Sequence, residues 1–186
     1  MGDALGLSRA SVIVAAHDPA WARLFAEEAA RLRTALRDRV GVIEHVGSTS
    51  VPGLDAKPIL DLMIAVDSLR EAEGLVPLLR ELGYAHKDDP EIPGRLYFVR
   101  GPAERRTHHL SLAEPRTAWW RQQLRFRDLL RGDPRLAADY ARLKHELAAR
   151  HPGDRRAYAT GKQPFIEGAL AEDARRIGSA DWHSAD

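Results

Sequence analysis

Residues 44–62 of the chain read EHVGSTSVPGLDAKPILDL, and this segment decides how the rest of the sequence is interpreted. Its centre, residues 47–53, is rich in glycine, proline and hydroxyl side chains and predicts a turn. Residues 40–46 before it and 59–66 after it have the length and apolar character of strands. The second strand is apolar enough to be covered on both faces. Asp61 nevertheless lies in its middle, where aspartate is depleted.

The turn has the composition of a phosphate site. Glycine at position 47 lets the backbone turn sharply and approach a ligand closely. If a helical turn begins at Ser48, free amides and the hydroxyl groups of Ser48, Thr49 and Ser50 converge on one point, which suits phosphate. The alternative is an ordinary Ser/Thr-rich loop without a ligand. Asp61 favours a site, because a buried carboxylate is costly unless it is paired, hydrogen-bonded or bound to a metal.

Outward from this segment, the chain alternates helical and strand patterns. Asp18 and Pro19 predict the start of a helix that runs to about residue 38. A second helix is expected over 68–82, with Gly83 as its C-cap. The remaining predictions for this half are an exposed loop over 86–94 and a hairpin of strands over 95–100 and 107–113, joined at Gly101 and Pro102.

From residue 116 onward the pattern is helical. Two helices are marked by apolar residues up to Leu130 and from Leu136 to Leu147, and Asp154 can cap a third, which Gly161 and Pro164 should interrupt or kink. Together the elements predict an α/β (α+β) fold, a mixed sheet flanked by helices with a helical C-terminal third. Residues 1–177 are expected to form a single domain, and 178–186 a disordered tail.

Composition narrows the classes of function. The 28 Lys and Arg residues nearly balance the 27 Asp and Glu residues, so the chain lacks the basic excess of a dedicated nucleic-acid-binding protein. The absence of cysteine excludes disulfides, thiolate metal sites and thiol nucleophiles, and fits a reducing compartment. No segment approaches the roughly 20 apolar residues of a spanning helix, and no signal peptide is recognised. The sequence therefore predicts a cytoplasmic protein with no membrane partner.

A glycine-serine turn followed, after twelve residues, by an aspartate in a strand is the layout of the nucleotidyltransferase superfamily. The whole segment 44–62 closely resembles the signature of the GrpB family, whose members are assigned to that superfamily by fold and are sometimes fused to dephospho-coenzyme A kinase. The resemblance covers nearly the whole chain. Further similar blocks are residues 17–28, 82–84, 105–110, 126–128, 140–144 and 156–166.

The resemblance implies a nucleotidyltransferase-like fold in which the turn holds phosphates and strand carboxylates hold Mg²⁺ or Mn²⁺. Asp61 and Glu44 are then the candidate catalytic residues, and Asp61, Glu44 and His109 the candidate metal ligands. For Glu44 the alternative is a salt bridge, and for His109 a simple hydrogen bond. The candidate phosphate and substrate ligands are Gly47, Ser48, Thr49, Ser50, Lys57, Arg106, His109 and Lys162.

The chain also departs from the pattern of an active transferase. The superfamily places a second acid two residues after the first, and this position is Met63 here. Where the GrpB pattern has His-Leu-His, this chain has His109-Leu110-Ser111, so one imidazole is missing. Magnesium prefers several oxygen ligands in octahedral geometry, and Asp61 alone does not supply them. Asp61 with His109 would suit a transition metal better than magnesium.

For the other charged and aromatic residues, a ligand role is compared with an ordinary role at the surface or in the core. Lys57 and Arg106 are the cations best placed to meet a phosphate, and Arg95 and Lys162 are weaker candidates. Trp119 and Trp120 are expected to anchor the core rather than stack on a base. The basic residues interleaved with the following helix are expected to form a solvated side: Arg121, Arg125, Arg127 and Arg131.

Two functions remain open from the sequence. The first is metal-dependent transfer of a nucleotidyl or phosphoryl group to a small acceptor. The second is a non-catalytic domain that binds a nucleotide, a coenzyme A precursor or another anionic metabolite, which Met63 and Ser111 favour. Binding of RNA or DNA is disfavoured by the near-neutral charge. The sequence does not indicate the acceptor or the oligomeric state.

Overall fold

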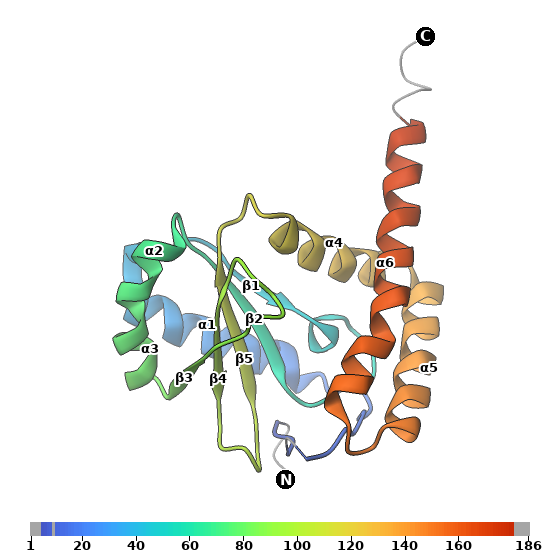
Figure 1. The fold of residues 1–186 in the computed structure, drawn as a ribbon, viewed down its shortest axis with the longest axis horizontal. Helices are drawn as coiled ribbons and strands as arrows, with labels where there is room; N and C mark the ends of the chain where they lie inside the picture. The colour runs from blue at the N-terminus through green and yellow to red at the C-terminus, as the bar shows by residue number, and fades with distance from the viewer. Residues whose placement is uncertain (1–4, 9, 181–186) are drawn as a thin grey trace.

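The computed structural model describes residues 5–8 and 10–180 of the chain. A mixed five-stranded sheet lies between two groups of helices (Figure 1). The strands lie in the order β1-β2-β5-β4-β3. Their bounds are β1 Ile43–Val46, β2 Leu60–Ala65, β3 Tyr84–Lys87, β4 Leu96–Arg100 and β5 His108–Ala113.

The two central strands, β2 and β5, are parallel, and every other pairing in the sheet is antiparallel. The register places Asp61 of β2 opposite Val46 of β1 on one side and opposite His109 of β5 on the other. Directly paired residues of neighbouring strands project from the same face of a sheet. Asp61 and His109 therefore lie side by side on one face, at the start of the two central strands.

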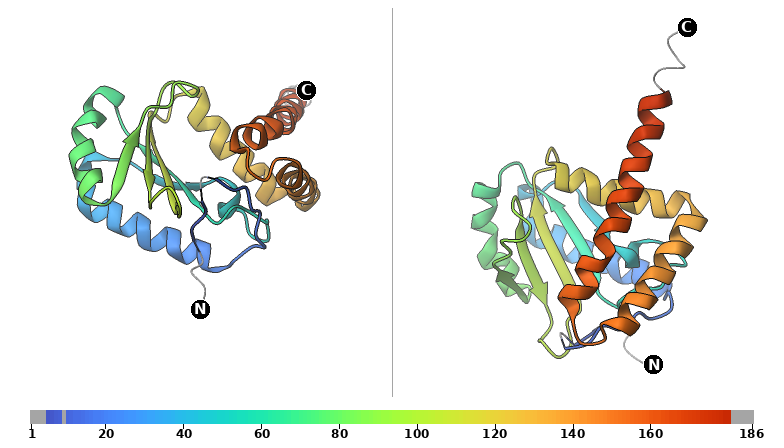
Figure 2. Two further views of the ribbon diagram at one scale, coloured as in Figure 1. Left: turned by 60° about the horizontal axis from the view of Figure 1, so that its bottom comes forward. Right: turned by 45° about the vertical axis from the view of Figure 1, so that its right-hand side comes forward.

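Helices cover the two faces of the sheet separately (Figures 1 and 2). The first group packs on the face that carries Leu60, Leu62 and Ile64, and the C-terminal group lies over the face that carries Met63 and Ala65. The first group is α1 Ala20–Leu36, α2 Leu69–Ala72 and α3 Val76–Glu81, and the C-terminal group is α4 Ala118–Gly132, α5 Pro134–Arg150 and α6 Arg155–Ala180.

The second strand is covered on both faces, as its apolar character predicts. Leu60, Leu62 and Ile64 are at most 1% exposed and join the main core with α1, α2 and α3. Met63 and Ala65 are buried on the opposite face against Trp120 of α4. The mixed α/β architecture, the five-stranded sheet and the helical C-terminal region expected from the sequence are therefore present.

Most elements lie close to the expected positions. The side chain of Asp18 accepts a hydrogen bond from the first amide of α1, that of Ala20, at 2.8 Å, as its capping role predicts. Gly83 has a positive φ of 83° after α3, and its amide bonds to Arg80, which confirms it as the C-cap. The antiparallel hairpin of β4 and β5 is also present.

Three local predictions differ from the structure. Residues 68–82 form two short helices separated by a 3₁₀ turn at Glu73–Leu75, instead of one helix. Strand β3 begins at Tyr84 and occupies the start of the stretch expected to be a loop; only its first residue is buried, so its sequence carries no alternating signal. Helix α6 continues through Pro164 without an assigned break. Gly161 packs against Leu147 of α5 there, and the neighbouring helix supports the backbone that proline weakens.

The described chain ends in a helix. Helix α6 extends to Ala180, so residues 178–180 of the expected tail are helical, and 181–186 lie outside the described residues. In the described part of the chain, none of the helices has both the length and the apolar character that crossing a membrane requires.

Glu28 links α1 to the far edge of the sheet. Its carboxylate accepts hydrogen bonds from Arg31 Nη2 at 2.6 Å, Tyr84 Oη at 2.8 Å and Arg100 Nη1 at 2.6 Å, and its side chain is only 7% exposed. Burial raises the pKa of Glu28, but the hydrogen bonds from Arg31 and Tyr84 and the positive charges outweigh it and lower the pKa. The stabilisation is therefore present at neutral pH and is lost as pH falls through the lowered pKa.

Substituting Glu28→Gln should lower the free energy of unfolding at pH 7 by about 2 kcal/mol, because two guanidinium groups lose a buried carboxylate. Glu27→Gln is the matched control. Its partner Arg23 is exposed, so its effect should stay within about 0.5 kcal/mol. Urea denaturation of both variants measures the difference, and equal effects would show that the Glu28 cluster does not hold α1 to the sheet.

Candidate functional site

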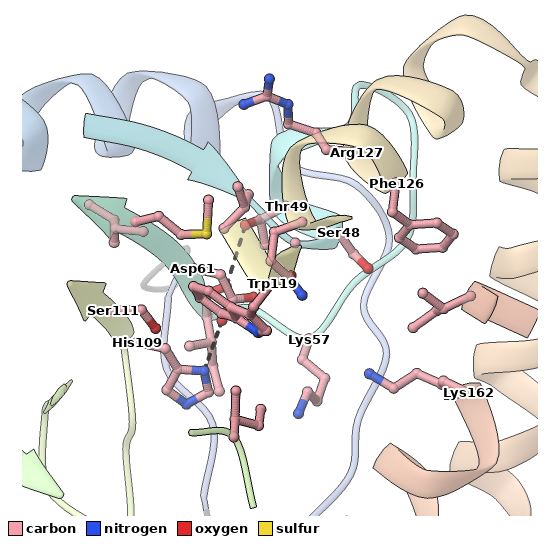
Figure 3. Close-up of a pocket in the computed structure, with 18 of the residues that line it drawn as sticks. Ser48, Thr49, Lys57, Asp61, His109, Ser111, Trp119, Phe126, Arg127 and Lys162 are labelled. Carbon is pink, nitrogen blue, oxygen red and sulfur yellow. Dashed lines mark hydrogen bonds and ion pairs between the residues drawn. The ribbon is translucent and has the colours of Figure 1, made fainter. Parts of the chain in front are cut away.

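A cavity of about 320 Å³ lies between the sheet face that carries Asp61 and the C-terminal helices (Figure 3). The turn Gly47–Thr49 and strands β2, β4 and β5 form one wall, and α4, α5 and α6 form the other. The two walls come from segments far apart in the chain. Of the candidate ligand residues, those that line it are Gly47, Ser48, Thr49, Lys57, Asp61, His109 and Lys162, together with Arg95.

Residue 47 has to be glycine. Its φ of 68° and ψ of −175° lie in a region that is essentially restricted to glycine. A Cβ atom at this position would also lie 2.4 Å from Oδ2 of Asp61. The turn continues as a 3₁₀ turn over Ser48–Ser50, and Ser50 Oγ donates a 2.6 Å hydrogen bond to the Gly47 carbonyl. The backbone at the turn is therefore packed directly against the carboxylate.

Asp61 and His109 form a hydrogen-bonded pair in the cavity wall, with 2.9 Å between Oδ1 and Nδ1 (Figure 3). Enclosure raises the pKa of Asp61, but the hydrogen bond and charge of His109 and the charges of Lys57 and Lys162 outweigh it and hold the pKa below its usual range. Asp61 is therefore an anion at neutral pH. Since Nδ1 is engaged by Asp61, Nε2 is the ring nitrogen of His109 that is left to meet a ligand.

Two lysines face the same cavity. Lys57 precedes β2, and Lys162 comes from α6; their Nζ atoms lie 5.4 and 4.9 Å from the centre of the Tyr158 ring. In the part of the chain that the structure describes, neither amine forms an ion pair. Burial, followed by the charges of Lys162 and Arg155, lowers the pKa of Lys57 from 10.5 to about 7. Burial also lowers the pKa of Lys162, although Asp61 opposes it.

The hydroxyl residues of the turn have different surroundings. Ser48 lines the cavity, and its side chain hydrogen-bonds to Tyr140 of α5. Thr49 is 3% exposed and lies 3.1 Å from Nε2 of His45, whose ring stacks on Phe25. Ser50 is buried and does not line the cavity. Of the three hydroxyl groups, Ser48 has the surroundings of a ligand residue, whereas Thr49 and Ser50 brace the turn.

Glu44 is separate from the cavity. Its carboxylate accepts a 2.6 Å hydrogen bond from Nη1 of Arg127 in α4, and it does not line the cavity. The salt bridge is therefore the alternative that the structure supports for Glu44. The proposed set of Asp61, Glu44 and His109 is not brought together, and over residues 5–8 and 10–180 no three His, Cys, Asp or Glu side chains are grouped to hold a metal ion.

Arg106 and Arg95 take roles that the sequence did not indicate. Arg106 is 7% exposed, donates to the Gly101 carbonyl at 2.6 Å, and lines a second cavity instead of this one. Arg95 lines the first cavity, donates to Ser111 Oγ at 2.8 Å and pairs with Asp89. Ser111 therefore positions this guanidinium.

Sequence reasoning missed part of the helical wall. Arg127 was expected to be solvated, but its side chain is 11% exposed because it pairs with Glu44, and it lines the cavity. Trp120 is a core residue as expected, whereas Trp119 also lines the cavity, with the Arg95 guanidinium 5.1 Å from its ring centre. Helical periodicity marks only the apolar face, so it carried no signal for a cavity wall at the edge of that face.

Together, the sheet, the turn and the cation-lined cavity define a mixed α/β protein with a pocket against the start of its two central strands. Residues 11–172 match the family described as GrpB protein, and the chain belongs to the GrpB family. A crystal structure of the conserved protein GrpB from Enterococcus faecalis is similar, with a TM-score of 0.80 and 34% identity, over 89% of this chain and 99% of the other.

Curated relatives agree with this family. The glutamate-rich protein GrpB of Alkalihalophilus pseudofirmus is 34% identical over 172 residues, which cover 90% of this chain and 99% of the relative. A dephospho-CoA kinase of Mycolicibacterium paratuberculosis is 30% identical over 95% of this chain and 49% of its own length. This chain therefore resembles about half of that longer protein.

Two glycines with positive φ provide a test of the turn. Gly47→Ala should lower the free energy of unfolding by about 3 kcal/mol, because both the backbone conformation and the contact with Asp61 oppose a side chain. Gly53→Ala is the control, since a Cβ there meets nothing within 4 Å, and its cost should be about 1 kcal/mol. Thermal or urea denaturation measures both; equal costs would contradict the tight packing of residue 47 on Asp61.

Proposed function

We propose that the first cavity binds a nucleotide or a related phosphorylated small molecule. The observation that carries this proposal is that Lys57 and Lys162 line one cavity beside the Gly47–Ser48 turn without ion-pair partners among the described residues. Burying an unpaired ammonium group is unfavourable, so such an arrangement is better explained by an anion that supplies the missing charge. Phosphate oxygens supply both the charge and several hydrogen-bond acceptors.

The cavity also has an apolar part that suits a base or another planar group. Trp119 and Phe126 of α4 line it together with Ile166 of α6. Aromatic rings stack on heterocycles, and a ligand of this kind joins an apolar ring system to a charged phosphate chain. A simple inorganic anion would leave this part of the cavity unused. The composition of the walls therefore favours a nucleotide-like ligand over phosphate alone.

The dephospho-CoA kinase relatives suggest which nucleotides to examine first. The name of those proteins refers to a coenzyme A precursor, and this chain resembles about half of their length. We therefore include dephospho-coenzyme A, which carries an adenosine and a pyrophosphate, among the candidate ligands beside ATP.

Metal-dependent transfer of a nucleotidyl or phosphoryl group to an unidentified small acceptor is the second candidate function. It is favoured by the anionic Asp61 in the wall beside the phosphate turn. A resident two-metal site does not fit the side chains present, because Met63 and the Arg127-bound Glu44 remove the other carboxylates. Mg²⁺ is often bound by one or two carboxylates together with substrate phosphates, and Asp61 would be the single carboxylate here.

A thermal-shift comparison tests the proposed ligand class. ATP and dephospho-coenzyme A, each with and without Mg²⁺ or Mn²⁺, should raise the melting temperature of the wild-type protein by roughly 5 °C at about one hundred times Kd. Lys57→Met should lose most of this shift. The ligand-free variant should melt at the same temperature as the wild type or higher, because an unpaired charge has been removed.

Arg142→Met is the control, since Arg142 is exposed on α5 and away from the cavity; its ligand shift should equal that of the wild type. A shift that needs metal and disappears in Asp61→Ala would support transfer, and a metal-independent shift would support binding alone. If neither nucleotide stabilises the wild-type protein, or if Lys57→Met retains the full shift, the proposed function is wrong.

Binding should also take up a proton. With a pKa of about 7, Lys57 is mostly neutral at pH 8 in the free protein, and a phosphate beside it favours the ammonium form. Affinity should therefore fall as pH rises above 7. Lys57 has the opposite effect on the stability of the free protein. Between pH 7 and 10.5 its amine is protonated in the unfolded chain and mostly neutral in the folded one, so the free energy of unfolding rises with pH over that window.

Isothermal titration calorimetry with ATP at pH 8, in two buffers of different ionisation enthalpy, measures this uptake. The apparent enthalpies should differ for the wild type and coincide for Lys57→Met. At pH 6 the amine of Lys57 is already charged, so Lys57 should no longer contribute to the difference between the wild-type enthalpies in the two buffers. Identical wild-type enthalpies at pH 8 would show that Lys57 is not the group that receives the anion.

A further inference from the structure

A second cavity, of about 480 Å³, lies beside the first. The two cavities share Tyr97 and His109, whose rings lie 5.8 Å apart between centres. His109 is therefore a common wall of both cavities. A molecule in the second cavity would be separated from a ligand of the first by the width of one or two side chains.

The sheet builds this second cavity by direct strand pairing. Lys87 of β3 is opposite Tyr97 of β4, and Val99 of β4 is opposite His109 of β5. Paired residues share a face, and Tyr97 and Val99 are two residues apart, so all four side chains project from one face of the sheet. Gly153, before α6, and Arg155, at the start of α6, close the cavity.

The charges around the second cavity favour an anion. Lys87, Arg106 and Arg155 contribute three positive charges, while Asp88 and Asp89 contribute two negative ones. Asp89 is engaged by Arg95, a residue of the first cavity, so its charge is already balanced. Arg106 is a predicted anion ligand that the structure places here, nearly buried in the wall. A guanidinium in such a position is well suited to a carboxylate or phosphate.

We propose that the second cavity binds a separate small molecule that carries a carboxylate or phosphate group. The two sites have different lysines but share a wall, and Arg95 of the first pairs with Asp89 of the second. The role of the second molecule rests on the proposed function: beside bound ATP, an oxygen of its carboxylate or phosphate attacks the γ-phosphorus and forms a new P–O bond, while the bond to the β–γ bridging oxygen breaks and ADP leaves. Nδ1 of His109 is engaged by Asp61, which leaves Nε2 as the ring nitrogen that can meet a bound molecule.

NMR titration of the ¹⁵N-labelled protein tests the second site, with inorganic phosphate and malonate as two anionic probes. Backbone signals of Val99 and Gly153 report on the second cavity, and those of Ser48 and Ile59 report on the first. In Lys57→Met, phosphate or malonate should still shift the signals of the second cavity. Lys87→Gln should weaken that binding by about fivefold, because a positive charge is lost, and Lys87→Glu should weaken it more, because the charge is reversed. Lys87 is exposed, so both variants should keep the fold intact.

Arg142→Gln is the matched control and should bind both probes as the wild type does. The probe that binds more tightly in the Lys57→Met background identifies the preferred group, phosphate or carboxylate. The proposal is overturned if neither probe shifts the signals of Val99 and Gly153, or if Lys87→Glu binds as tightly as the wild type. If these signals respond while ATP fails to shift Ser48, the second site stands and the proposed function fails.

Discussion

The contact between Gly47 and the carboxylate of Asp61 is the constraint on which the rest of the site depends. The carboxylate occupies space that any side chain at residue 47 would need, so the turn after β1 can pack against β2 only as glycine. On its other side Asp61 is held by His109, which the parallel pairing of β2 and β5 places directly opposite. One carboxylate thus joins the turn and both central strands, and the cavity opens above it.

The cations that line the cavity are of two kinds, which differ in whether a carboxylate pairs with them. Arg127 and Arg95 have carboxylate partners, Glu44 and Asp89, and therefore contribute to the packing of the walls. Lys57, from the segment before β2, and Lys162 of α6 instead meet over the ring of Tyr158, where burial works against both charges and the charge of Lys162 also works against that of Lys57. Natural sites commonly keep such unfavourable groups where a ligand needs them. This contrast supports an anion site at the two lysines.

Local sequence patterns predicted the parts of the fold that depend on local physics. The apolar strand around Asp61, the cap at Asp18 and the C-cap at Gly83 follow from alternation and backbone preference, and all three are present. The pairing of Glu44 with Arg127 could not be predicted, because the two residues meet only when α4 crosses β1. The position of Arg106 could not be predicted either, because it lines the second cavity although it lies in a family-like block. Strand β3 was missed because its exposed residues carry no alternating pattern.

A crystal structure of the protein grown with ATP tests the central claim most directly. The account predicts phosphate oxygens within hydrogen-bond distance of Nζ of both Lys57 and Lys162, next to the Gly47–Ser48 turn, with the adenine against Trp119 or Phe126. The Asp61–His109 hydrogen bond should remain intact beneath the phosphates. ATP bound elsewhere, or phosphates that contact neither lysine while the cavity stays open, would contradict the assignment of this cavity as the anion site.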